Sequence, residues 1–102
     1  MAMETSYNVY ALRQALLRDF KRYDGTPIGA AELAQISVAL PVRYAPPGAA
    51  ETECRELTLM GYLEPLPGWG GVYLRITQKG LEQLAPEFPH DVFVWGPSAV
   101  RR

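Results

Sequence analysis

The sequence predicts an α+β fold that is mostly helical: a three-helix core, a β-hairpin, a short C-terminal helix and an apolar tail. Three observations lead to this prediction. Apolar residues recur every three or four positions in three segments before Gly61. Two strand-like runs then flank a turn at residues 67–71, which holds three glycines and a proline. Finally, Thr77 is a good N-cap for a last short helix.

The first expected helix covers residues 7–23. Five apolar or aromatic residues in this segment step by three or four and so share one helix face: Val9, Leu12, Leu16, Phe20 and Tyr23. The breakers Gly25 and Pro27 end the helix. We expect a short extended link at Pro27 and Ile28 to follow.

A second, shorter helix is expected over residues 30–38, and Pro41 ends it because proline lacks an N–H and restricts the residue before it. Residues 40–48 contain three prolines and a glycine, a composition too irregular for a helix and too rich in proline for a central strand. We therefore expect a surface connection there, with Val42 and Tyr44 pointing inward.

Helical spacing resumes over residues 49–60, through Ala50, Cys54, Leu57 and Met60. Gly61 ends this third helix because glycine tolerates the left-handed conformation. With the inner face fixed by Cys54, Leu57 and Gly61, four residues are expected to point outward: Ala49, Thr52, Glu53 and Glu56.

The C-terminal half of the fold is expected to be a hairpin and a short helix. Residues 62–66 and 72–76 are the two strands around the glycine-rich turn. The last helix is expected over residues 78–84, with Leu81 and Leu84 facing the core.

Length and composition indicate one ordinary globular domain. The chain has 102 residues, of which 48% are hydrophobic and 21% charged, so we expect a single domain over 1–102, with its core at 7–85 and a C-terminal tail at 86–102. No run approaches the ~18 apolar residues that cross a bilayer, and the N-terminus lacks the pattern of a signal peptide. We therefore expect a cytoplasmic protein with no membrane segment.

Residue types that support metal and enzyme chemistry are scarce. Cys54 is the only cysteine, which excludes an intrachain disulfide and leaves no zinc ligand set or CxxC redox pair. We expect Cys54 to be buried as a small hydrophobe rather than to act as a redox sensor. The only histidine, His90, stands beside Asp91, but no serine in a GxSxG setting accompanies them. We expect no enzyme, no metal and no cofactor, and a turn or capping role for His90.

Two stretches within residues 53–84 carry a resemblance to a known family. The first combines Cys54 and Leu57 with the run Gly61-Tyr62-Leu63-Glu64, and the second is the run Tyr73-Leu74-Arg75-Ile76-Thr77-Gln78-Lys79-Gly80-Leu81. After two helices, these stretches resemble the winged helix-turn-helix domain, and locally they are similar to MarR-like and PadR-like regulators. The resemblance implies a DNA-binding transcriptional regulator, and it favours a dimer formed by elements that flank the core.

The resemblance also implies that the third helix enters the DNA major groove while the hairpin contacts the adjacent backbone or minor groove. The candidate DNA-binding residues are Arg13, Arg18, Lys21, Arg22, Thr52, Glu53, Arg55, Glu56, Trp69, Arg75 and Lys79. The first helix is basic, because its four cations outweigh Asp19 by three charges. This basic face either holds phosphate or is an ordinary solvated face.

The charge of the third helix favours a different partner. Glu51, Glu53 and Glu56 against Arg55 give this helix a charge of −2, and the whole chain has a formal net charge of −1. Carboxylates are repelled by a groove lined with phosphates. The alternative hypothesis is therefore a winged-helix module that binds a protein and does not touch DNA.

Two apolar features could contact a protein partner. Trp69 lies between glycines at the expected hairpin tip. There it either stacks on a nucleobase or ribose or anchors a protein partner, or else it packs on its own hairpin or on Tyr73. The apolar run at residues 92–95 in the tail either packs on its own domain or pairs with another chain in a homodimer. The partner candidates are Trp69, Val92, Phe93, Val94 and Trp95, and the sequence leaves both hypotheses open.

Overall fold

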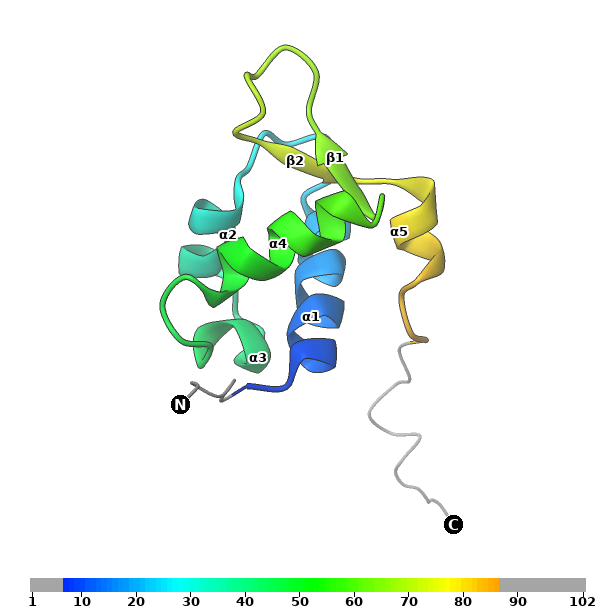
Figure 1. Ribbon diagram of the computed structural model, residues 1–102. Helices are drawn as coiled ribbons and strands as arrows, with labels where there is room; N and C mark the ends of the chain where they lie inside the picture. The colour runs from blue at the N-terminus through cyan, green and yellow to red at the C-terminus, as the bar shows by residue number, and fades with distance from the viewer. Residues whose placement is uncertain (1–6, 87–102) are drawn as a thin grey trace.

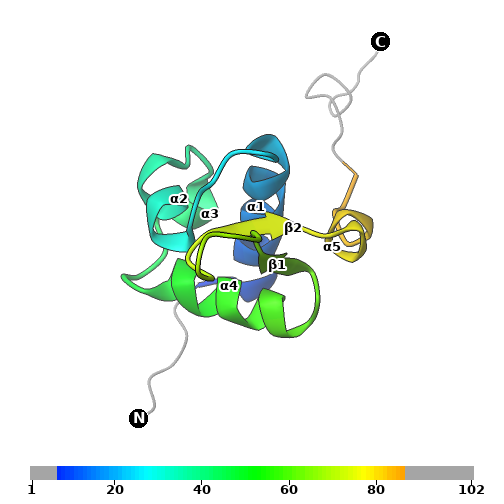
Figure 2. The same cartoon turned by 90° about the horizontal axis from the view of Figure 1, so that it is seen from above.

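Helix α1, Val9–Arg22, is the element on which most other segments pack. A computed structural model describes residues 7–86 of the chain. These residues form five helices and a two-stranded antiparallel sheet, in the order α1, α2, α3, α4, β1, β2, α5 (Figure 1). Viewed from above, the hairpin lies over α1 and α4, whereas α5 stands to one side (Figure 2). The predicted α+β, mostly helical fold is confirmed for this part of the chain.

The apolar face predicted for α1 is buried. Leu12, Leu16 and Phe20 are almost completely inaccessible to solvent, and each such side chain stabilises the fold by about 2 kcal/mol relative to an exposed position. The helix begins where the side-chain oxygen of Asn8 accepts a 3.0 Å hydrogen bond from the amide of Ala11. The first helix therefore supplies the centre of the core.

Helix α2, Ala30–Ile36, is shorter than the predicted 30–38. The hydroxyl of Ser37 donates a buried 2.6 Å hydrogen bond to Oδ2 of Asp19 on α1, and the backbone of Ser37 is extended. Because this bond draws Ser37 out of the helix, Val38 is exposed and does not continue the apolar face of α2.

The prediction of an irregular connection over 40–48 is wrong in its first part, which forms the one-turn helix α3, Leu40–Arg43. Pro41 lies in the first turn, where an N–H would have no helical partner and the fixed φ of proline suits the helix. Val42 is buried as expected, but Tyr44 is 79% exposed. Tyr44 does not point inward with Val42, because residues two apart on a helical turn face different directions. In an extended chain, Val42 and Tyr44 would lie on the same side.

Helix α4, Ala49–Leu59, agrees with the predicted 49–60. Cys54 and Leu57 are buried, and the helix packs against α1 and α2. Gly61 follows with a φ of +85°, the left-handed conformation that the sequence predicted at this helix end.

A short antiparallel hairpin follows α4. Its strands are β1, Leu63–Pro65, and β2, Leu74–Ile76. The amide of Leu74 also donates a 3.0 Å hydrogen bond to the carbonyl of Ile28, so the link between α1 and α2 lies beside β2. The hairpin is therefore attached to the core both through α4 and through this link.

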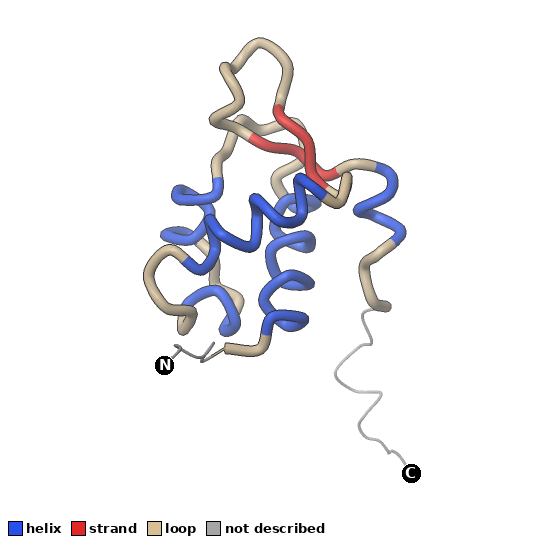
Figure 3. The backbone as a smooth tube through the Cα atoms, viewed as in Figure 1, coloured by secondary structure: helices blue, strands red, loops and turns tan. Residues whose placement is uncertain are grey.

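Both strands are shorter than the predicted 62–66 and 72–76. Gly70 and Gly71 have positive φ angles, which lie outside the strand region, so the turn continues past them. The resulting loop, residues 66–73, is called the hairpin loop and extends beyond the strands at the top of the molecule (Figure 3).

Helix α5, Gln78–Glu82, begins as predicted, because Oγ1 of Thr77 accepts a 3.0 Å hydrogen bond from the amide of Gly80. Leu81 and Leu84 are partly buried against the core, as expected. The helix ends two residues before the predicted boundary of 78–84.

Gln14 of α1 explains this early end. Its Nε2 donates a 2.7 Å hydrogen bond to the carbonyl of Gln83, and its Oε1 accepts a 2.8 Å hydrogen bond from the amide of Ala85. These bonds hold the chain after α5 against α1 in a non-helical path.

Gly80 leaves no room for a side chain between α5 and the hairpin. A Cβ at this position would overlap the carbonyl oxygen of Tyr62 and lie 2.8 Å from Cγ1 of Ile76. Alanine normally stabilises a helix by about 1 kcal/mol relative to glycine, but here we expect Gly80→Ala to lower the free energy of unfolding by about 2 kcal/mol. Urea unfolding followed by circular dichroism measures the change, with the exposed Gln78→Ala as the control. Unchanged or raised stability would contradict the close packing of α5.

Candidate interaction surface

Two of the residues expected to contact DNA, Arg13 and Glu53, bind each other. Nε of Arg13 lies 2.7 Å from Oε1 of Glu53, and the hydroxyl of Tyr7 donates a 2.7 Å hydrogen bond to Oε2 of the same carboxylate. Glu53 is only 5% exposed. The predicted outward positions of Glu53 and Ala49 are therefore wrong. Both residues are buried because the inner stripe of α4 also follows steps of four, from Leu57 through Glu53 to Ala49.

The buried carboxylate changes the titration of its phenol partner. Its hydrogen bond to Tyr7 raises the pKa of that hydroxyl above 10.0, burial and the charge of Glu53 add to the shift, and the charge of Arg13 opposes it. The fold therefore favours protonated Tyr7. This contribution to stability is fully present below pH 10 and is lost as the pH rises through the raised pKa.

With Glu53 inside, the exposed face of α4 carries fewer charges than the sequence indicated. Thr52 and Glu56 are exposed as predicted, Arg55 is exposed as well, and Glu51 is partly exposed. Two carboxylates against one guanidinium give this face a charge of −1, where the count over the whole helix gave −2.

An apolar groove, which we call the α4–hairpin groove, lies between α4 and the hairpin. It has a volume of about 290 Å³ and is lined by Ala30, Glu51, Cys54, Arg55, Thr58, Leu59, Pro65, Gly71, Val72 and Leu74. Leu59 and Val72 are 76% and 66% exposed. Leu59 was not among the residues expected to contact a partner. It lies two residues after Leu57 and outside the buried repeat of α4, and this position is a signal for an exposed leucine.

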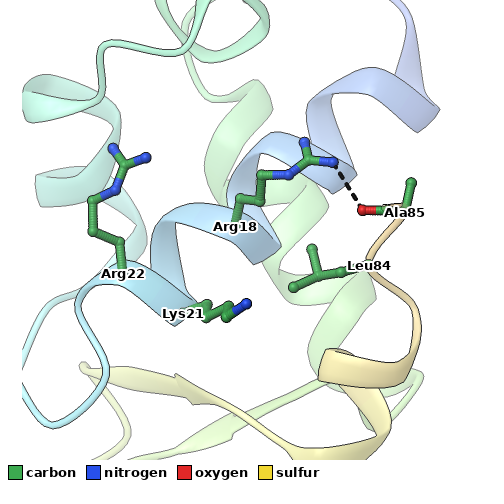
Figure 4. A pocket seen from close by; sticks show the side chains of 5 residues that line it. All are labelled: Arg18, Lys21, Arg22, Leu84 and Ala85. Atoms are coloured by element: carbon green, nitrogen blue, oxygen red, sulfur yellow. Dashed lines mark hydrogen bonds between the residues drawn. The ribbon is translucent and has the colours of Figure 1, made fainter. Parts of the chain in front are cut away.

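Three cations of α1 line a separate hollow beside the chain that follows α5 (Figure 4). The hollow has a volume of about 470 Å³ and is lined by Arg18, Lys21, Arg22, Leu84 and Ala85. Nη2 of Arg18 donates a 3.2 Å hydrogen bond to the carbonyl of Ala85, and Nη1 of Arg22 lies 3.8 Å from Oδ1 of Asp19. In Figure 4, α4 lies behind α1. The structure therefore places these cations and the exposed face of α4 on different sides of α1.

The two remaining cationic candidates contact residues in the hairpin or directly before it. Nε of Arg75 lies 2.6 Å from Oε2 of Glu64 on the opposite strand, an exposed pair of the kind that adds little stability. Nζ of Lys79 lies 5.4 Å from the ring centroid of Tyr62, a cation–π contact. The hairpin loop itself contains no lysine or arginine, so its tip offers no cation to a phosphate.

Trp69 packs on its own hairpin and also remains accessible. Its ring centroid lies 5.2 Å from that of Tyr73, with the rings at 70°, the edge-to-face arrangement that aromatic pairs prefer. The residue is still 48% exposed. Packing of Trp69 on its own hairpin is therefore compatible with contact between its exposed part and a partner.

The tail candidates Val92, Phe93, Val94 and Trp95 lie outside the described residues, as does His90. Within residues 7–86, no group of three or more His, Cys, Asp or Glu is placed to hold a metal ion. None of the helices in this range combines the length and apolar character needed to cross a membrane. Comparison of the chain with protein families, with curated proteins and with solved structures gave no match.

The pair of Arg13 and Glu53 predicts an asymmetric response to mutation. Arg13→Met keeps the aliphatic packing but removes a charged donor from a buried carboxylate, so we expect the free energy of unfolding to fall by about 3 kcal/mol. Replacing both partners, as Arg13→Met with Glu53→Met, should recover much of this loss because no unpaired charge stays buried. Denaturant unfolding at neutral pH measures both, and Arg55→Met on the exposed face of α4 is the control. Equal effects of Arg13→Met and Arg55→Met would disprove the buried pair.

Cys54 is predicted to be an unreactive thiol although it lines the α4–hairpin groove. Burial, with smaller effects of the charges on Glu51 and Glu53, raises the pKa of this thiol to about 12. The thiolate is the reacting form, and a pKa three units above that of an exposed thiol lowers its population about 1,000-fold near pH 8. We therefore expect labelling by a disulfide reagent at pH 8 to be at least about 100-fold slower in the folded protein than in denaturant. Similar rates would show that Cys54 is accessible.

Proposed function

We propose that this chain is a winged helix-turn-helix domain that binds a protein segment in the α4–hairpin groove. Three features support the fold assignment. Helix α2 packs against α4, the antiparallel hairpin follows α4 directly, and the link at Ile28 hydrogen-bonds to β2 as a short first strand would. One feature departs from the family pattern, because α3 and the chain up to Gly48 stand in place of the tight turn between the second and third core helices.

The observation that carries the functional proposal is the chemistry of the α4–hairpin groove. In a winged helix, this is the side that would face the DNA major groove. Here it presents the apolar side chains of Leu59 and Val72, and its charged lining residues are one guanidinium, Arg55, and one carboxylate, Glu51. DNA affinity depends on cations that neutralise phosphates, whereas protein interfaces centre on apolar anchors with a polar rim.

DNA binding is the second candidate function, and the cationic hollow beside α1 is the observation that favours it. Lys21 and Arg22 are exposed there, and Arg18 lines the same hollow. A duplex bound to this side would contact cations of α1 through its phosphates, and a regulator of transcription would result. The exposed face of α4 would then lie away from the DNA. Neither candidate function includes a catalytic step.

A duplex titration separates the two candidates. Fluorescence anisotropy of a labelled mixed-sequence duplex is followed at roughly 50 mM salt, where electrostatic binding is strongest. We expect no binding by the full chain. Binding that weakens steeply with added salt and is lost in Lys21→Ala/Arg22→Ala would support the second candidate and overturn the first.

A positive test uses peptides displayed on phage, selected against the full-length protein. We expect enrichment of peptides with aliphatic or aromatic residues, because the groove is apolar and its lining carries only one carboxylate and one guanidinium. The selected peptides should lose affinity for Val72→Ser by at least about tenfold, a change of about 1.4 kcal/mol. The same peptides should bind Lys21→Ala unchanged. Peptides that ignore Val72→Ser would place the binding surface elsewhere.

A further inference from the structure

We propose that the segment held in the α4–hairpin groove is residues 92–95 of a second copy of this chain. The inference rests on the proposed function, because it names the partner of the same groove. Each copy would then supply one apolar segment and one groove, and reciprocal exchange between two copies closes a twofold-symmetric dimer.

The chemistry of residues 92–95 matches the groove. The run Val92-Phe93-Val94-Trp95 contains only apolar and aromatic side chains, which are the types that anchor interfaces in apolar pockets. Such a run also needs a cover, since an uncovered apolar strand-forming segment promotes aggregation. The groove offers Leu59 and Val72, two exposed apolar side chains that need the same cover.

Positive charge follows the apolar run along the chain. Arg101 and Arg102 follow the apolar run, and no acidic residue lies between Trp95 and the two arginines. Glu51 and Glu56 are carboxylates on the exposed side of α4, one of them a lining residue of the groove. With the apolar run in the groove, these arginines can reach the carboxylates of Glu51 and Glu56 on α4, although Arg55 also lines the groove and has the same sign of charge.

The path of the chain favours a second copy over the same molecule. Gln14 and Arg18 hold residues 83–85 against the side of α1 that faces away from α4. The described part of the chain ends at Pro86, after α5, and both Figure 1 and Figure 2 place α5 on the far side of α1 from α2, whose first residue Ala30 lines the groove. The six residue steps from Pro86 to Val92 span at most about 22 Å when fully extended, and α1 lies between α5 and α2. A second copy has no such constraint.

The oligomeric state of the full-length protein tests this inference. Sedimentation equilibrium over about 1 to 100 µM should give twice the 11.4 kDa mass of one chain. Both Val72→Ser in the groove and Phe93→Ser/Trp95→Ser in the tail should weaken the dimer at least about tenfold. Val38→Ser is the matched control, because it makes the same change at an exposed valine outside the groove, and it should leave the dimer intact. Thermal unfolding by circular dichroism checks that each variant is folded.

Mixing the variants identifies the exchange directly. The Val72→Ser chain keeps an intact tail, and the Phe93→Ser/Trp95→Ser chain keeps an intact groove, so an equimolar mixture should recover a dimer with one occupied groove. A monomeric wild type at 100 µM, a dimer unaffected by Val72→Ser, or a mixture that stays monomeric would each overturn the inference. If selected peptides still bind the groove in that case, the proposed function stands and its partner is a different protein.

Discussion

The buried carboxylate of Glu53 fixes how α4 is rotated against α1, and the surface of the protein depends on that rotation. Its two oxygens are bonded to Arg13 and Tyr7, so the side of α4 that carries Glu53 faces α1. The opposite side, with Arg55 and Leu59, then faces solvent beside the hairpin. Turning α4 about its axis would separate the buried charge from its donors, at a cost of several kcal/mol.

The polar residues of α1 attach other segments of the fold in the same way. Arg13 holds α4, Gln14 holds the chain after α5, and Asp19 accepts a hydrogen bond from Ser37 at the end of α2. Each bond reaches a segment that apolar contacts alone would leave free to slide or rotate, because apolar packing has little directionality and hydrogen bonds have much. A helix that looks basic and solvated by composition is therefore the common attachment for three other parts of the chain.

The pairs that cations form within the fold limit which positive charges a partner at the α4–hairpin groove can meet. Arg13 is committed to Glu53, Arg75 contacts Glu64, and the cations at Lys21 and Arg22 lie on a different side of α1 from the exposed face of α4. The positive charge of the chain is thus divided among internal pairs and a separate hollow. What remains at the α4–hairpin groove is an apolar surface with one carboxylate, Glu51, and one guanidinium, Arg55, which resembles the composition of a protein interface more than that of a phosphate-binding surface.

The sequence by itself determined the order of the elements other than α3, the apolar face of α1, the N-cap at Thr77, the end of α4 at Gly61 and the burial of Cys54, because periodicity, caps and glycine conformations are local properties. Only the tertiary structure decided that Glu53 and Ala49 are buried, that Ser37 ends α2 early, that Pro41 begins a helical turn, and that Leu59 and Val72 form a groove with Arg55. These outcomes depend on partners far away along the chain. A charged residue near the edge of a helix face turns inward only when donors such as Arg13 and Tyr7 lie opposite it, and no local pattern records that.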